Sequence, residues 1–396
     1  MKIAVLTSGI LPVPSVEGGA VENLIDFYLD YNDKHHQHDI TIYSIFNPLV
    51  KRYQALQSSA NHYRYINSNT LFAKIGKRIY RWIHGRSYYH DTIQYYLYRN
   101  ISQMKKSSFD FIIVENRPGY IPLLSHEFPS TPIVLHLHND LLNANTPNGK
   151  LIYDSTYRII TVSNYISQCV KTIDANSSKC ITIYNGIDLN KFSPSNITVS
   201  ASRSDYGVSD DDFLLVFSGR IIPEKGIKQL IEAMLLLNDY PKIKLMVLGS
   251  SFYGNNTYTT DFIQILKKKA EPLGNRLFFT GYIPYEKMPS MLAMADVAVL
   301  PSVWDEPFGM TCLEAMSMGL PLITTKKGGI PEIVSPGCGT MLSMSIESDF
   351  TIQLANQIIK FYNDRDMLMS MRQQALLNRQ RYSKEVYAQS FLNAIS

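Results

Sequence analysis

The stretch WDEPFGMTCLEAMSMGLPLITTKKGGIPEIV covers residues 304–334 and holds two carboxylates, Glu306 and Glu314, separated by seven residues. An apolar segment precedes it, and a Pro-Phe-Gly turn separates that segment from residues 311–318, so we predict a strand, a tight turn and a helix. The start of such a helix presents unpaired N–H groups and the positive end of the helix dipole, which suits a phosphate. Glu306 precedes this anion site and Glu314 lies in the first turns of the helix. The stretch therefore predicts a site for a diphosphate with hydroxylated groups at both ends.

A second strand–turn–helix pattern lies upstream. The apolar strand at 213–218 runs into GRIIPEKGIKQLIEAM, which places Arg220 and Lys225 in one turn beside two glycines. Two cations at the carboxyl end of a strand can clamp a diphosphate. The alternative is that Lys225 is a solvated charge at the start of a helix.

In the N-terminal part of the chain, loops with candidate binding residues also follow the predicted strands. Gly18 and Gly19 lie between a first strand at 2–7 and a helix from about Val21, so their N–H groups can approach a phosphate, although a plain turn is the alternative. The spacing lacks G-x-G-x-x-G and is therefore no dinucleotide fingerprint. His138 follows a strand at 132–138, where open α/β sheets place ligands.

The motif residues resemble a known family. EPFGMTCLEAMSMGLPLIT followed by GG-x-PE, with G-R-x-x-x-x-K-G at 219–226 and NGID at 185–188, closely resembles the retaining GT-B glycosyltransferases of family 4, the glycosyl transferases group 1. The resemblance implies an α/β GT-B fold of two Rossmann-like, doubly wound domains that face a central cleft. It also implies that Arg220 and Lys225 hold the diphosphate of a nucleotide-diphospho-sugar.

Further roles follow from the resemblance alone. Glu306 is expected to hydrogen-bond the donor sugar, Glu314 the ribose hydroxyls, and His138 to face the sugar, which makes Glu306 and His138 the expected catalytic pair. His136 is expected inside the sheet. The remaining expected donor-binding positions are Gly18, Gly19, Tyr282, Phe308, Gly309, Met310 and Thr311.

Length and composition indicate two domains without a membrane span. The 396 residues are 45% hydrophobic and 18% charged, values typical of a globular chain of more than one domain. We predict an acceptor-binding domain at 1–195, a nucleotide-sugar-binding domain at 196–375, and a C-terminal helix at 376–396 that crosses back to the first domain. After Val334 the pattern predicts helices at 347–364 and 366–396. No cofactor or metal is expected, because fixed positive groups would replace a metal and the four cysteines lack metal-ligand spacing.

Positive charge is concentrated between residues 51 and 106. This segment holds eleven Lys or Arg against one acid, a net charge of +10 in a chain whose total is +4. Ile75, Ile79 and Trp82 recur there at helical spacing, a pattern typical of a helix on an anionic bilayer surface. The alternative is a helix packed on the sheet with a solvated basic face, and no nucleic-acid motif accompanies the charge. The residues expected at this membrane or acceptor surface are Lys74, Lys77, Arg78, Arg81 and Trp82.

These features lead to one expected function and its alternatives. We expect a retaining, metal-independent glycosyltransferase that takes a nucleotide sugar, with a UDP-sugar favoured, and a glycan or lipid-linked acceptor. Its expected setting is bacterial cell-surface polysaccharide assembly, such as capsule or lipopolysaccharide, on the cytoplasmic face of the membrane, with no nucleic acid as partner. The alternatives are a nucleotide-sugar epimerase, a phosphorylase-like enzyme that needs a pyridoxal-binding lysine, and a non-catalytic scaffold on the same fold.

Overall fold

The computed structural model divides the chain into two compact units. Unit 1 comprises Met1–Gly186 and Lys384–Ser396, and unit 2 comprises Ile187–Ser383. The chain therefore passes between the units at residues 186–187 and 383–384, whereas the predicted domains end at 195 and 375. The structure describes residues 1–53, 59–84, 88–197, 201–250, 261–344 and 349–395.

Unit 1 is built on a parallel sheet of seven strands in its described part, in the order β3-β2-β1-β4-β5-β6-β7. The central strands are mostly apolar and almost fully buried, as strands covered by helices on both faces should be. The strands are β1 (Lys2–Leu6), β2 (Asp39–Ile45), β3 (His62–Ile66), β4 (Phe111–Glu115), β5 (Ile133–Leu137), β6 (Arg158–Thr161) and β7 (Cys180–Thr182).

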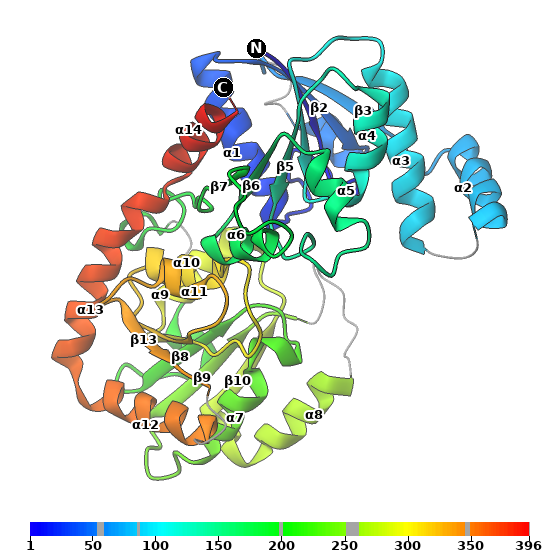
Figure 1. The fold of residues 1–396 in the computed structure, drawn as a ribbon. Helices are drawn as coiled ribbons and strands as arrows, with labels where there is room; N and C mark the ends of the chain where they lie inside the picture. The colour runs from blue at the N-terminus through cyan, green and yellow to red at the C-terminus, as the bar shows by residue number, and fades with distance from the viewer. Residues whose placement is uncertain (54–58, 85–87, 198–200, 251–260, 345–348, 396) are drawn as a thin grey trace. The chain divides into compact units, whose positions relative to one another are not determined.

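The helices of unit 1 include one from the C-terminal end of the chain. Helix α14 packs along α1, where the rings of Tyr28 and Phe391 stack with their centroids 4.4 Å apart (Figure 1). The last helix thus completes the apolar core of unit 1. The helices are α1 (Ala20–His35), α2 (Leu71–His84), α3 (Tyr88–Met104), α4 (Ile121–Glu127), α5 (Gly149–Asp154), α6 (Asn164–Lys171) and α14 (Lys384–Ala394).

Unit 2 repeats the design with a parallel sheet of six strands across its described residues, in the order β10-β9-β8-β11-β12-β13. Its strands are β8 (Phe213–Ser218), β9 (Ile243–Leu248), β10 (Leu277–Gly281), β11 (Val297–Leu300), β12 (Leu322–Thr325) and β13 (Gly339–Leu342). Its helices are α7 (Ile227–Leu235), α8 (Asp261–Ala270), α9 (Met288–Ala293), α10 (Met310–Ser317), α11 (Ile330–Ile333), α12 (Phe350–Asn363) and α13 (Arg365–Asn378).

Both sheets have the doubly wound order, in which the direction of winding reverses beside the first strand of the unit. Ligands of such sheets bind outside the carboxyl ends of the strands at that reversal. The reversal lies between β1 and β4 in unit 1 and between β8 and β11 in unit 2. The predicted α/β class with two Rossmann-like units is confirmed.

One element prediction is wrong. The sequence predicts a single helix over 366–396, but α13 ends at Asn378 and α14 begins at Lys384. A 3-10 turn and the extended residue Ser383 (ψ 151°) separate them. The helix is interrupted because the chain leaves unit 2 and returns to unit 1 at this point.

Candidate functional site

The candidate site of unit 2 lies where the loops after β8 and β11 meet, at the reversal of the sheet. Gly226 has a φ of +72°, and a Cβ atom there would lie 1.9 Å from the carbonyl oxygen of Pro301. Only glycine therefore lets the loop that carries Lys225 approach the loop that leads to Glu306. This close approach brings together two motifs that are about 80 residues apart in the sequence.

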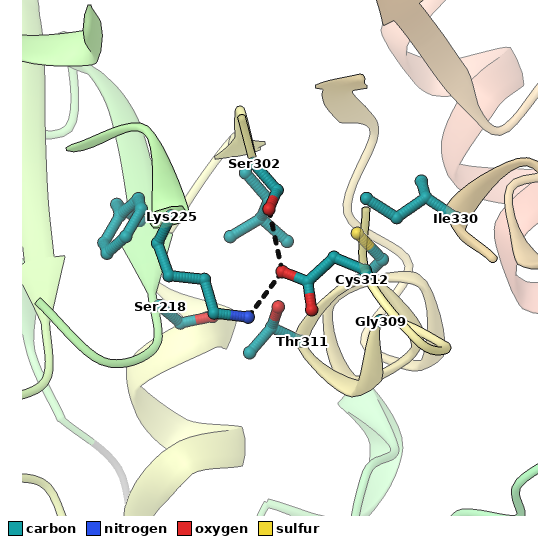
Figure 2. Close-up of a pocket in the computed structure, with 10 residues that line it drawn as sticks. Ser218, Lys225, Ser302, Gly309, Thr311, Cys312 and Ile330 are labelled. Atoms are coloured by element: carbon teal, nitrogen blue, oxygen red, sulfur yellow. Dashed lines mark hydrogen bonds and ion pairs between the residues drawn. The ribbon is translucent and has the colours of Figure 1, made fainter. Parts of the chain in front are cut away.

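The central interaction of the site is an ion pair. The Lys225 Nζ atom lies 2.5 Å from Glu306 Oε1, and the hydroxyl of Ser302 donates to the same oxygen at 2.9 Å. Figure 2 shows the Lys225 side chain and Ser302 reaching this carboxylate from different loops. Both members of the pair are more than four-fifths buried, so solvent screens the interaction weakly.

The Gly-Gly segment after β12 holds the backbone of Glu306. The N–H of Gly329 donates to the carbonyl of Glu306 at 2.7 Å. Gly328 has a φ of +53°, and a Cβ atom there would lie 2.2 Å from the same carbonyl oxygen. The GG-x-PE motif therefore fixes Glu306 by packing backbone against backbone.

Helix α10 directs its N-terminus into the same pocket. Gly309 is its N-cap, with a φ of 111°, and Thr311 of its first turn lines the pocket (Figure 2). The hydroxyl of Ser218, also in the lining, has no hydrogen-bond partner among the described residues. Burial raises the pKa of the Cys312 thiol to about 12, so this cysteine is a poor nucleophile. The pocket is lined by Phe217, Ser218, Lys225, Leu300, Ser302, Glu306, Gly309, Thr311, Cys312 and Ile330.

The side chain of Glu314, on α10, is buried. Burial raises its pKa to about 7, although the nearby charges of Lys191 and Lys225 lower it. The sequence-based prediction did not include Lys191, although it follows the NGID motif by three residues. Its Nζ atom lies 4.1 Å from the centroid of the Tyr285 ring, and burial lowers its pKa. Lys191 is therefore a further cation of this region.

Other predicted donor residues of unit 2 do not line the pocket. Arg220 is half-buried in the loop after β8, and Met310 is half-buried at the start of α10. Phe308 is buried, and its ring meets Tyr382 edge-on at 6.4 Å, so this side chain belongs to the core. Tyr282 is 40% exposed just after β10, an edge strand.

In unit 1 the predicted Gly-Gly pair directly precedes α1. Gly19 is the N-cap, with a φ of 110°, and the Glu22 carboxylate folds back over it. Burial raises the pKa of Glu22 to about 7. A carboxylate of the helix itself therefore covers this helix N-terminus, a feature that the sequence-based prediction missed.

His138 lies just beyond β5 at the same edge of the unit 1 sheet. Its Nε2 atom is 3.1 Å from Glu115 Oε2, and Nδ1 of His136 is 2.9 Å from the same oxygen. Burial lowers the pKa of His138 to about 4. His136 lies inside the sheet, as predicted, and is fully buried.

Helix α2 carries the predicted surface residues and stands beside α3 at the margin of unit 1 (Figure 1). Its large apolar side chains face solvent, with Phe72 81% and Trp82 86% exposed, and Leu71, Ile75 and Ile79 exposed as well. Lys74 and Arg78 are exposed and Lys77 is half-buried. The Arg81 side chain lies outside the described residues. None of the helices in the described ranges has the length and apolar character of a membrane span.

Comparison with known proteins assigns the family. The model of the glycosyl transferases group 1 matches residues 199–377. The putative glycosyltransferase YtcC of Bacillus subtilis is 30% identical over 344 residues, which cover 84% of this chain and 77% of that protein. The chain belongs to the glycosyl transferases group 1.

One further relative and one solved structure are also similar to this chain. The lipopolysaccharide 1,2-N-acetylglucosaminetransferase of Salmonella typhimurium is 26% identical over 283 residues, 71% of each chain. The structure of HepE from Anabaena in complex with UDP has a TM-score of 0.73 at 20% identity, and the match covers 100% of this chain and 99% of that one. This likeness, at low identity, confirms the GT-B fold.

Apart from Tyr282, which follows the edge strand β10, the predicted site residues of this group 1 glycosyltransferase fall into three places. Lys225, Glu306, Gly309 and Thr311 line one pocket in unit 2, and Arg220, Phe308, Met310 and Glu314 lie in the elements that build it. Gly18, Gly19 and His138 lie at the carboxyl edge of the unit 1 sheet, and the basic residues lie on α2.

Proposed function

We propose that this protein is a retaining, metal-independent glycosyltransferase that moves a sugar from a UDP-sugar to a glycan acceptor carried on a lipid. Its proposed setting is bacterial cell-surface polysaccharide assembly at the cytoplasmic face of the membrane. The observation that carries the proposal is the pocket in which a buried lysine, the N-terminus of α10 and the Glu306 carboxylate converge.

The reaction breaks the bond between the anomeric carbon and the diphosphate, so negative charge develops on the leaving oxygen. Lys225, Arg220 and the positive end of the α10 dipole would stabilise that charge. These fixed positive groups take the place of a metal ion. The unpartnered hydroxyl of Ser218 offers a further donor to a phosphate oxygen.

Glu306 is proposed as a positioning group for the donor sugar. Ser302, Lys225 and the backbone of Gly329 hold it in place, so it would accept a hydrogen bond from a sugar hydroxyl in a fixed direction. The acceptor oxygen then forms its bond on the face that the diphosphate leaves. Its proton passes to the departing phosphate oxygen, which gives retention without a protein nucleophile.

Glu314 and Lys191 are proposed to face the nucleoside end of the donor. A carboxylate can accept hydrogen bonds from two hydroxyl groups of a ribose. The buried Glu314 side chain belongs to α10, the helix whose N-terminus would meet the diphosphate. UDP is favoured as the nucleotide because the fold match includes HepE with UDP and with UDP-glucose. The Salmonella relative supports a lipid-linked glycan as the acceptor class.

Peripheral membrane binding is proposed through α2. Leu71, Phe72, Ile75, Ile79 and Trp82 fall within about 100° of one another around a helix, and all are exposed. The basic residues flank this apolar face on one side. An apolar face beside lysines and arginines matches an anionic bilayer, to which each cation adds about 1 kcal/mol.

A donor panel with EDTA present tests the enzymatic proposal. Purified protein would be mixed with UDP- and GDP-sugars, and thermal stability and slow nucleotide release would be followed. One nucleotide should stabilise the fold, and one UDP-sugar should lose its nucleotide in EDTA. Release of an epimer, or a strict need for a metal ion, would contradict the proposal.

Liposome flotation tests the membrane proposal. The double variant Phe72→Ser with Trp82→Ser should lose binding to vesicles that contain anionic lipid. Met369→Ser with Leu377→Ser is the matched control, because these two apolar side chains on α13 are 62% and 68% exposed. Equal binding by both double variants would remove α2 from the membrane surface.

A further inference from the structure

The carboxyl group of Glu314 is a buried acceptor that the protein itself leaves unused. The residue is 8% exposed, and its side chain makes no hydrogen bond or ion pair with any other residue that the structure describes. Buried polar groups of folded proteins are almost always hydrogen-bonded, so an unbonded one needs an explanation. A ligand that brings hydroxyl donors would satisfy this carboxyl group.

The other carboxylate of the motif, Glu306, is already satisfied by protein groups. Its Oε1 atom lies 2.5 Å from Lys225 Nζ and accepts from the hydroxyl of Ser302 at 2.9 Å. Because Lys225 lies directly against this carboxylate, the negative charge of Glu306 opposes the effect of Lys225 on Glu314. Of the two cations that lower the pKa of Glu314, Lys225 is therefore the one held by another carboxylate.

The second cation, Lys191, belongs to a segment that is attached to α10. The carbonyl of the next residue, Phe192, accepts from Arg379 Nη1 at 3.2 Å, and the same nitrogen donates to the carbonyl of Ser317 at 2.6 Å. Ser317 is the last residue of α10, one turn beyond Glu314. One guanidinium nitrogen thus holds the Lys191 segment beside the helix that carries Glu314.

The contacts of Lys191 orient its side chain without neutralising its charge. The backbone N–H donates to the Asp188 carboxylate at 3.2 Å. The Nζ atom lies 4.1 Å from the centroid of the Tyr285 ring, which itself packs on Phe192 at 5.3 Å. Nζ is also 3.9 Å from Glu286 Oε1, but the Glu286 side chain is 79% exposed, so solvent screens this pair.

The other titratable groups that interact with Glu314 are uncharged near pH 7. Burial raises the pKa of the Tyr285 phenol well above its ordinary value, and burial raises the pKa of the Cys312 thiol to about 12. Both groups therefore stay protonated. Among the described residues, burial disfavours the ionised form of Glu314, and Lys191 and Lys225 favour it.

We propose that Lys191 is a positioning residue whose charge keeps Glu314 ionised, so that the Glu314 carboxylate can accept hydrogen bonds from both hydroxyls of the donor ribose. This inference rests on the proposed function. An ionised carboxylate accepts with both oxygens, and its hydrogen bonds are roughly twice as strong as those of a neutral acceptor. Lys191 acts here through Glu314 and needs no contact with the donor. The ribose contact should therefore strengthen as the pH rises through about 7, the pKa of Glu314.

Carbon NMR of the ligand-free protein tests the effect of Lys191 on Glu314. The protein would be labelled with ¹³C at the glutamate carboxyl groups, and Glu314→Gln would identify the signal. In Lys191→Met the pKa of Glu314 should rise by about one pH unit, the effect of losing a nearby opposite charge, whereas Lys191→Arg should preserve it. Lys287→Met is the matched control, because it removes an exposed cation from the turn that carries Tyr285. An unchanged pKa in Lys191→Met overturns the inference.

Calorimetry with two nucleotides tests the link to the ribose. The analogue 2′,3′-dideoxy-UDP keeps the base and the diphosphate but lacks both hydroxyls, so the ratio of its Kd to that of UDP isolates the ribose contact. In the wild type this ratio should rise about 10-fold between pH 6 and pH 8, as Glu314 ionises. In Lys191→Met the ratio at pH 7 should be about 5-fold lower than in the wild type, because fewer molecules carry the ionised group.

The two experiments separate the failure of this inference from the failure of the proposed function. A ratio that does not change with pH in the wild type overturns the inference even where Lys191→Met fails to fold. Absence of binding by every nucleotide would instead overturn the proposed function, and the NMR titration would still decide whether Lys191 controls the charge of Glu314.

Discussion

Glu314 offers a quantitative test of how the candidate site is built. The change Glu314→Gln keeps the size of the side chain and removes its ability to ionise. Burial raises the pKa of Glu314 from 4.5 to about 7. At 1.36 kcal/mol per pKa unit, the folded environment therefore disfavours the ionised form of Glu314 relative to its protonated form by about 3 kcal/mol.

The sign of the effect follows from the direction of the shift. Because the folded-state pKa is above the unfolded value, the folded protein binds the proton more tightly. The contribution of this group to stability is full below pH 4.5 and is lost as the pH rises through about 7. The Gln variant does not suffer this loss, so its advantage over the wild type should increase by about 3 kcal/mol between pH 4.5 and pH 8.

Urea unfolding at several pH values measures this difference. Unfolding would be followed by Trp304 fluorescence in a Trp82→Phe background, because the chain has two tryptophans and Trp304 lies in unit 2. Glu271→Gln, at an exposed position of the same unit, is the matched control and should show no such pH dependence. A difference between Glu314→Gln and the wild type that does not change with pH would refute the argument that burial controls this carboxyl group.

The remaining predictions concern the ligand, the loops and acid stability. Glu314→Ala should weaken UDP binding by about 1–3 kcal/mol in calorimetry, the effect of losing a hydrogen bond to a charged group, and unchanged affinity would remove Glu314 from the site. Lys225→Met should weaken UDP binding at least 10-fold. Uridine, which lacks the diphosphate, should bind the variant and the wild type with the same weak affinity. An equal loss of affinity for UDP and for uridine would argue against a contact between Lys225 and the diphosphate. Gly226→Ala should lower thermal stability more than Gly207→Ala, because both glycines have positive φ but only Gly226 lies against the backbone of another loop. Equal losses of about 1–2 kcal/mol in the two variants would mean that the backbone strain at positive φ is the only effect. Since Glu115 has a folded pKa of about 2, below its ordinary 4.5, its contribution is present above pH 4.5 and lost as the pH falls toward 2. The stability gap between wild type and Glu115→Met should therefore narrow in acid, and a gap that stays constant in acid unfolding curves would contradict this.

The sequence predicted the elements that depend on local pattern. Apolar runs such as β1 and β8 predict strands covered on both faces, and the turn residues Pro307 and Gly309 mark the start of α10. Strand β13, with the sequence GTML, escaped prediction because it is short and half-buried at the edge of its sheet. The break before α14 also escaped, because the residues there favour a helix locally and only the return to unit 1 interrupts it.

The sequence by itself determined the two-unit α/β architecture, the family, and the loops that carry Lys225, Glu306 and the N-terminus of α10. These follow from residues that are close together along the chain. Only the tertiary structure decided that Lys225 meets Glu306, that Glu115 holds His138, and that the apolar face of α2 stays exposed. The reason is physical: these contacts depend on the order and register of parallel strands and on which helix faces are covered, and no local pattern encodes the distance between side chains that lie on different strands.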